Sequence, residues 1–121
     1  MDFPVEALGP AVAARAGAWA RLGVGWRVRP VTPNHGKPMV AGEFESATWT
    51  GHLLVWVSGE AELDAVRLDD ERVVSKHYDL AGPADLEVLL GELDALLAAG
   101  RLPDAAAVTS RVGPESGRTT I

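Results

Sequence analysis

The chain has 121 residues, 47% of them hydrophobic, which suits one domain with a buried core and is too short for two. Its 17 acidic and 11 basic residues give a net charge of -6, which opposes unaided nucleic-acid binding and favours a basic partner. The lack of cysteine excludes disulfides and thiolate metal sites and fits a reducing cytoplasm. Because no signal peptide or apolar run of about 18 residues occurs, we expect a cytoplasmic protein that does not contact a membrane.

The first predicted element is an amphipathic helix within residues 4–22. Its apolar stripe has the three- or four-residue spacing of a helix and comprises Val5, Leu8, Val12, Ala16 and Trp19. Gly23 supplies the stop. Pro10 allows either a start at Gly9-Pro10, with proline in the first turn, or a kinked longer helix, and we favour the later start.

Two strands are expected next. Residues 24–29 alternate apolar and polar side chains before Pro30, which predicts a short strand at an edge of the sheet. Residues 32–37 have the composition of a loop. Residues 38–47 predict a weaker strand, which Gly42 weakens further or marks as a bulge.

Residues 52–65 predict a β-hairpin that reverses at Ser58-Gly59. Its first arm is apolar on both sides, whereas the second alternates acidic and apolar residues, as a strand with one solvated face does. A two-residue turn would place Val57 opposite Glu60. A strand at residues 72–78 follows, after a reversal at residues 69–71.

A C-terminal helix is predicted at residues 83–99. Its apolar side carries six leucines, which are Leu86, Leu89, Leu90, Leu93, Leu96 and Leu97. Pro83 suits the first turn, and Gly100 followed by Pro103 suits the end. We therefore expect an α+β fold in which a four- to five-stranded antiparallel meander has both helices on one face. Residues 1–103 would form the single domain, and residues 104–121 a polar, flexible tail.

The uncovered face of this sheet is the predicted binding surface. Trp19 and Trp26 fall in the apolar phase of their elements and are expected in the core, whereas Trp56 is in the outward phase. A large aromatic side chain among acids on a solvated face indicates contact with a partner. The candidate partner-binding residues are Trp56, Glu60, Glu62, Asp64, Glu43, Glu45 and His52. The alternatives are a reversed phase, or a loop that covers Trp56.

No pattern in the sequence predicts a catalytic, metal or cofactor site. His35, His52 and His77 lack the short spacings of metal-binding motifs, and Ser58 lies in a turn rather than at a strand-to-helix elbow. Alternating acids on one strand are typical of a solvated face. An enzyme is therefore disfavoured.

Several short motifs resemble the TriTu immunity proteins of bacterial polymorphic toxin systems, over about residues 5–98. They are Lys37-Pro38, Gly51-His52-Leu53-Leu54-Val55-Trp56-Val57-Ser58-Gly59-Glu60 and Lys76-His77-Tyr78-Asp79. In that family an apolar strand ends in Val-Trp, a variable residue and Ser-Gly, and the last strand ends in His-Tyr. The chain departs from the pattern at Pro10, in the first helix, and at Val57. A more polar residue is expected at position 57.

The resemblance implies a small antitoxin that protects its producer by binding a cognate toxin. The acidic composition agrees with a basic toxin as partner, without direct contact to nucleic acid. Two other classes stay open: a small chaperone or adaptor of a secretion system, and an enzyme or small-ligand protein, which needs a deep pocket. Dimerisation through the open face is a further alternative.

Overall fold

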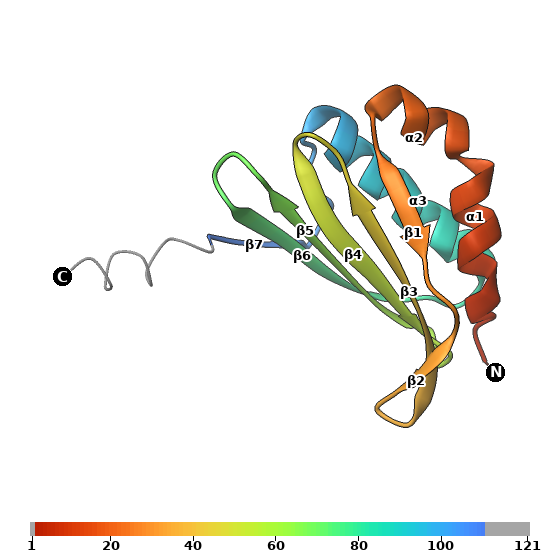
Figure 1. Ribbon diagram of the computed structural model, residues 1–121. Helices are drawn as coiled ribbons and strands as arrows, with labels where there is room; N and C mark the ends of the chain where they lie inside the picture. Colours follow the sequence, from red (N-terminus) through yellow and green to blue (C-terminus); the bar gives the residue numbers. More distant parts are fainter. Residues whose placement is uncertain (1, 111–121) are drawn as a thin grey trace.

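The computed structural model describes residues 2–110 and shows an α+β architecture of one antiparallel sheet with helices on one face (Figure 1). The helices are η1 (Val5–Ala7), α1 (Leu8–Ala14), α2 (Ala16–Leu22) and α3 (Pro83–Ala99). The strands are β1 (Gly25–Val28), β2 (Thr32–Asn34), β3 (Lys37–Glu45), β4 (Trp49–Trp56), β5 (Glu60–Arg67), β6 (Arg72–Asp79) and β7 (Ala107–Ser110). The sheet order is β1-β3-β4-β5-β6-β7, with β2 also paired to β3. The predicted fold class is confirmed.

The N-terminal helical segment differs in detail from the prediction. It begins with the 3-10 turn η1, and Pro10 lies in the first turn of α1, where its missing N–H removes no helical hydrogen bond. The interruption occurs at Arg15, whose φ of -103° and ψ of 15° separate α1 from α2. Gly23 ends α2 with a φ of 69°, as the predicted stop requires.

Two short strands were not predicted. Residues 32–34, expected to be loop, form β2 and pair with the start of β3. Residues 107–110, assigned to a flexible tail, form β7, which pairs with β6 at the far edge of the sheet. The rest of the predicted tail from residue 111 lies outside the described residues. All four residues of β7 are exposed, so this strand has no buried face from which a periodic pattern could arise.

The β4–β5 hairpin has a longer loop than predicted. Residues 57–59 form the loop, and Val55 pairs with Ala61. Gly59 has a φ of 93°, which fits the left-handed third position of a three-residue hairpin loop. The predicted two-residue turn was therefore wrong, and the pairing of the two strands is shifted by one residue. The predicted turn would have set Trp56 opposite Ala61, whereas the observed register places it opposite Glu60.

The core lies between the inner sheet face and the helices. Leu53, Val55 and Leu63 of the central strands are at most 1% exposed. The five leucines of α3 that cover them are also at most 1% exposed; they are Leu86, Leu89, Leu90, Leu93 and Leu96. Trp19 is buried as predicted, and its indole N–H donates to the Val12 carbonyl. Trp26 is partly buried against this core, next to Trp19 and Phe44.

Glycines allow close packing at two points of the sheet. A Cβ on Gly42 would lie 2.8 Å from the Trp26 ring, so this glycine admits the tryptophan rather than marking a bulge. A Cβ on Gly51 would lie 2.6 Å from Phe44 Cζ and 2.9 Å from Ala65 Cα. Within residues 2–110, no helix is long and apolar enough to cross a membrane.

Candidate functional site: the open face of the sheet

The strand register places all seven candidate residues on the uncovered face of the sheet. Residues that pair directly across antiparallel strands point to the same face. One cross-strand row runs through Arg27, Glu43, His52, Asp64 and Ser75. A second row runs through Leu54, Glu62 and His77. Figure 1 shows no helix over this side.

Trp56 points outward, but the β2–β3 hairpin shields it in part. Its indole N–H donates to Asn34 Oδ1 at 3.3 Å, and its strand neighbour Met39 is only 8% exposed. Trp56 itself has intermediate exposure. The Trp56 side chain therefore faces outward, and the neighbouring β2–β3 hairpin covers part of it. The tryptophan presents an apolar surface whose polar atom already has a partner.

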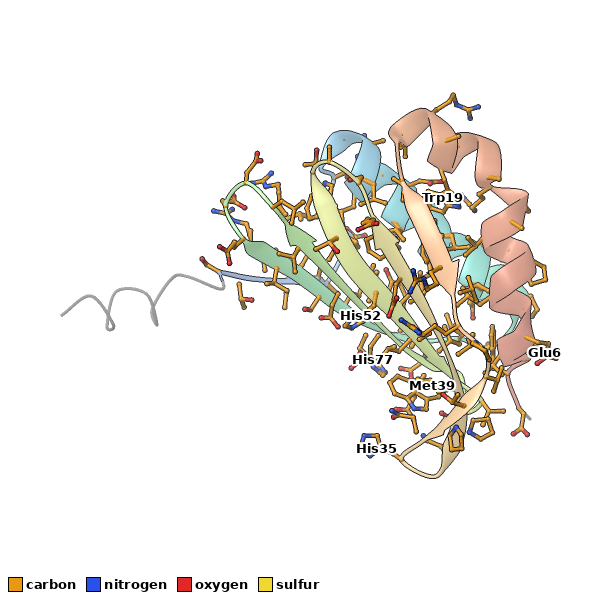
Figure 2. The ribbon with its side chains drawn as sticks, in the orientation of Figure 1. Glu6, Trp19, His35, Met39, His52 and His77 are labelled. Atoms are coloured by element: carbon orange, nitrogen blue, oxygen red, sulfur yellow. The ribbon has the colours of Figure 1, made fainter. Side chains whose placement is uncertain are left out.

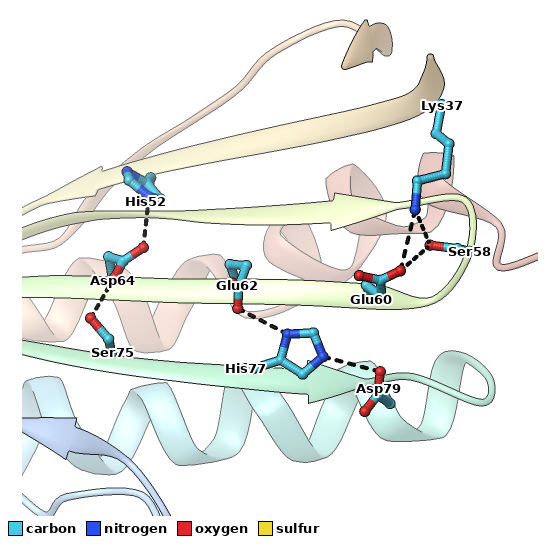
Figure 3. A network of polar contacts seen from close by, with 9 residues as sticks. All are labelled: Lys37, His52, Ser58, Glu60, Glu62, Asp64, Ser75, His77 and Asp79. Atoms are coloured by element: carbon cyan, nitrogen blue, oxygen red, sulfur yellow. Dashed lines mark hydrogen bonds and ion pairs between the residues drawn. The ribbon is translucent and has the colours of Figure 1, made fainter. Parts of the chain in front are cut away.

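Two of the candidate acids form ion pairs with cations of the same face. Arg29 donates to both carboxylate oxygens of Glu43, at 3.0 and 3.2 Å, and this hydrogen bonding lowers the Glu43 pKa. Lys37 Nζ lies 3.2 Å from Glu60 Oε2, and the resulting hydrogen bond lowers the Glu60 pKa (Figure 3). These carboxylates stay ionised, yet much of their charge is locally balanced.

Two histidines contact two further candidate acids, Asp64 and Glu62 (Figure 3). His52 Nε2 lies 3.0 Å from Asp64 Oδ2, and Ser75 Oγ donates to Asp64 Oδ1 at 2.5 Å. His77 lies between Glu62 and Asp79, with ring nitrogen to carboxylate distances of 3.0 and 3.1 Å. Only the doubly protonated ring can donate to both, so Asp79 and Glu62 raise the His77 pKa.

Strand β6, which carries His77, also connects the sheet to α3 on its inner side. Tyr78 Oη donates to Glu92 Oε1 at 2.7 Å, and Lys76 Nζ lies 3.0 Å from the same oxygen. Burial raises the Tyr78 pKa well above its usual value, and the nearby Glu92 carboxylate adds to the effect. The adjacent His77 and Tyr78 therefore serve opposite faces: the histidine faces solvent, and the tyrosine supports the sheet–helix contact.

A shallow hollow of about 660 Å³ indents the open face between β1, β3, β4 and β5. Its lining is Gly25, Trp26, Arg27, Glu43, Phe44, Glu45, Thr50, Gly51, His52, Asp64 and Val66. Gly25, Arg27 and Glu45 are exposed at its β1–β3 side. Among residues 2–110, Arg27 and Glu45 form neither an ion pair nor a side-chain hydrogen bond, unlike most charged residues of the face.

The polar side chains of the open face mainly contact one another (Figure 3). No group of three or more His, Asp or Glu side chains in the described part of the chain could hold a metal ion. Ser75 Oγ donates to the Asp64 carboxylate rather than to a histidine. Ser58 lies in the hairpin loop and contacts Lys37 and Glu60.

Five residues of this network were not among the predicted site residues: Lys37, Ser58, Ser75, His77 and Asp79. A signal existed for three of them, because Ser75, His77 and Asp79 alternate along one strand. The inward-facing Lys76 obscured that alternation. Lys37 could not be found from sequence, because its Nζ reaches Glu60 across strands that are not direct neighbours in the sheet.

Comparison with protein families gives a match to the model described as "Immunity protein TriTu" over residues 14–95, which is more than half of the chain. The matched segment runs from the end of α1 into α3 and contains β1 to β6. Comparison with curated proteins and with solved structures gives no match.

Proposed function

Because the chain belongs to the TriTu family of immunity proteins, we propose that it is an antitoxin that binds and neutralises a cognate bacterial toxin. The observation that carries this proposal is the open sheet face, where one aromatic and several acidic side chains lie together with no helix over them. An acidic sheet face is ordinary by itself, but an outward-facing tryptophan among the acids supports contact with a partner.

The toxin contact is centred on Trp56 and includes Glu43, Glu45, Glu60 and Glu62. The side chains of His52 and Asp64 complete the surface. A partly buried aromatic anchor slows dissociation, because the partner must expose apolar surface to leave. The acids act at longer range, since their field attracts a basic protein and speeds encounter. Inhibition needs no catalysis in this scheme, because the bound antitoxin acts by occupying the toxin.

The test is binding to the toxin domain encoded beside this chain, purified as an inactive variant. The double variant Trp56→Ala/Glu62→Lys removes the anchor and reverses one acid. We expect a loss of about 2 kcal/mol or more, which is roughly a thirtyfold increase in Kd, by titration calorimetry. Co-expression with active toxin should then no longer support growth.

Two further variants separate the binding effect from misfolding and from net charge. Glu62→Lys alone leaves the Trp56–Asn34 contact intact and should weaken binding less than the double variant. Glu6→Lys reverses an exposed acid of η1, away from His52 on the sheet (Figure 2), and should leave Kd nearly unchanged. Unchanged affinity of the double variant would remove the assignment of this face. Absence of any complex with the wild-type chain would remove the antitoxin function itself.

A further inference from the structure

We propose that the hollow beside β1 receives an arginine or lysine side chain from a protruding loop of the toxin, with Glu45 as its main ionic partner. This inference rests on the antitoxin function proposed above. It goes further by assigning the part of the open face that receives a cationic group of the partner.

The distribution of ion pairs points to this end of the face. The acids nearest Trp56 already contact cations or histidine of the same chain, as the pairs Lys37–Glu60 and His77–Glu62 show. A cation from the toxin gains less from such an acid, because the new contact competes with an existing one. Glu45 is exposed and forms no ion pair among residues 2–110. Its charge is therefore the most available on the face.

The shape of the hollow provides room beside Glu45. Gly25 lies directly opposite Glu45 in the β1–β3 register and is exposed. A Cβ on Gly25 would meet no atom within 4 Å, so the space over Gly25, across from Glu45, is open. A long, flexible basic side chain can enter this hollow of about 660 Å³ without displacing backbone.

The carboxylate of Glu45 favours a cation at its side of the hollow. Glu43 and Asp64 also line the hollow, but Arg29 and His52 already contact them, and Arg27 is the arginine of the lining. Arg27 has no ion pair within the described part of the chain, so it is available to donate to a carbonyl or carboxylate oxygen of the same toxin loop. The complementary ligand is thus a loop with a basic side chain and an adjacent hydrogen-bond acceptor.

Two variants test this assignment against the same inactive toxin domain. Glu45→Lys reverses the available charge, and Gly25→Trp fills the hollow with a side chain. We expect each to raise Kd about tenfold or more, with a larger effect on dissociation for Gly25→Trp. The matched controls are Glu6→Lys, with the same change of net charge, and Gly91→Trp on α3, where a Cβ also meets no atom within 4 Å. Each control should change Kd less than about twofold, since surface positions away from a contact rarely matter.

The outcomes distinguish this inference from the antitoxin function. If Glu45→Lys and Gly25→Trp bind as tightly as wild type while Trp56→Ala/Glu62→Lys does not, the hollow assignment is wrong and the proposed function stands. Equal weakening by Glu45→Lys and Glu6→Lys would mean that net charge alone acts, and it would also overturn the assignment. If the wild-type chain does not bind the toxin, both fail. Thermal unfolding of each variant guards against loss of fold, and Glu45→Lys keeps the test valid if Gly25→Trp does not fold.

Discussion

The most discriminating test of the sheet geometry is alanine substitution at two glycines, Gly51 and Gly25. Both glycines lie in strands that line the hollow, so the pair compares one chemical change in two environments. A Cβ at position 51 would lie 2.6 Å from Phe44 Cζ and 2.9 Å from Ala65 Cα, and it would also contact the Asp64 carbonyl oxygen. A Cβ at position 25 would meet nothing within 4 Å.

The expected effects have opposite signs. Overpacking costs about 1–3 kcal/mol, and Gly51→Ala belongs at the upper end because two of its three contacts are backbone atoms of β5. Relief would require β4 and β5 to move apart and strain their hydrogen bonds. Gly25→Ala should instead stabilise the fold by about 0.4–1 kcal/mol, because alanine restricts the unfolded chain. The two variants should therefore differ by about 2–4 kcal/mol in the free energy of unfolding.

Urea denaturation followed by tryptophan fluorescence measures this difference directly. With an m-value of about 1–3 kcal/mol per molar urea, the midpoints of the two variants should differ by about 0.7–4 M. The m-value itself should not change, since both variants bury the same surface. If Gly51→Ala unfolds at the same urea concentration as Gly25→Ala, the crowding at position 51 does not exist and the β4–β5 packing described above is wrong.

Three further predictions concern single side chains. Tyr78 is the only tyrosine, so absorbance at 295 nm should stay flat through about pH 10, where free tyrosine ionises, and rise only as the protein unfolds; a titration near pH 10 in the folded state would contradict its burial. His77 has a raised pKa, so its stabilising contribution is complete below the unfolded pKa of about 6.5 and is lost as pH rises through the folded pKa. His77→Gln should therefore destabilise the protein more at pH 5.5 than at pH 9 in urea unfolding. An equal effect at both pH values would refute the hydrogen bonds from His77 to Glu62 and Asp79. Leu89→Ala, at a fully buried site of α3, should cost about 2–5 kcal/mol, whereas Val88→Ala, 59% exposed on the same helix, should cost little; similar thermal unfolding of the two would contradict the helix orientation.

The fold class and the inward face of each long element could be predicted from local patterns. The leucines of α3 recur at helical spacing, and the acids of β5 alternate with alanine and leucine. These periods arise because one side of each element is buried, and each residue carries that information without reference to distant partners. The open face, with Trp56 and its acids, followed from the same alternation.

Register, edge strands and ion pairing depended on contacts between distant residues. The sequence did not reveal that the hairpin loop has three residues, which is what places Trp56 with Glu60 instead of Ala61. The strands β2 and β7 were missed because short edge strands bury few side chains. They are held by backbone hydrogen bonds, which leave no pattern in the side chains.

The availability of each charge was also decided by tertiary structure. By composition, Glu45 and Glu60 are equivalent acids, yet Lys37 reaches only Glu60. The hollow beside Glu45 likewise depends on Gly25 of β1, which lies directly opposite Glu45 of β3. Sequence by itself therefore determined an acidic, open sheet face with an aromatic side chain on it, because a strand with one solvated face alternates polar and apolar residues along the chain. Only the tertiary structure decided which of those acids form ion pairs within residues 2–110, because charge pairing depends on distance in space and not on position in the chain.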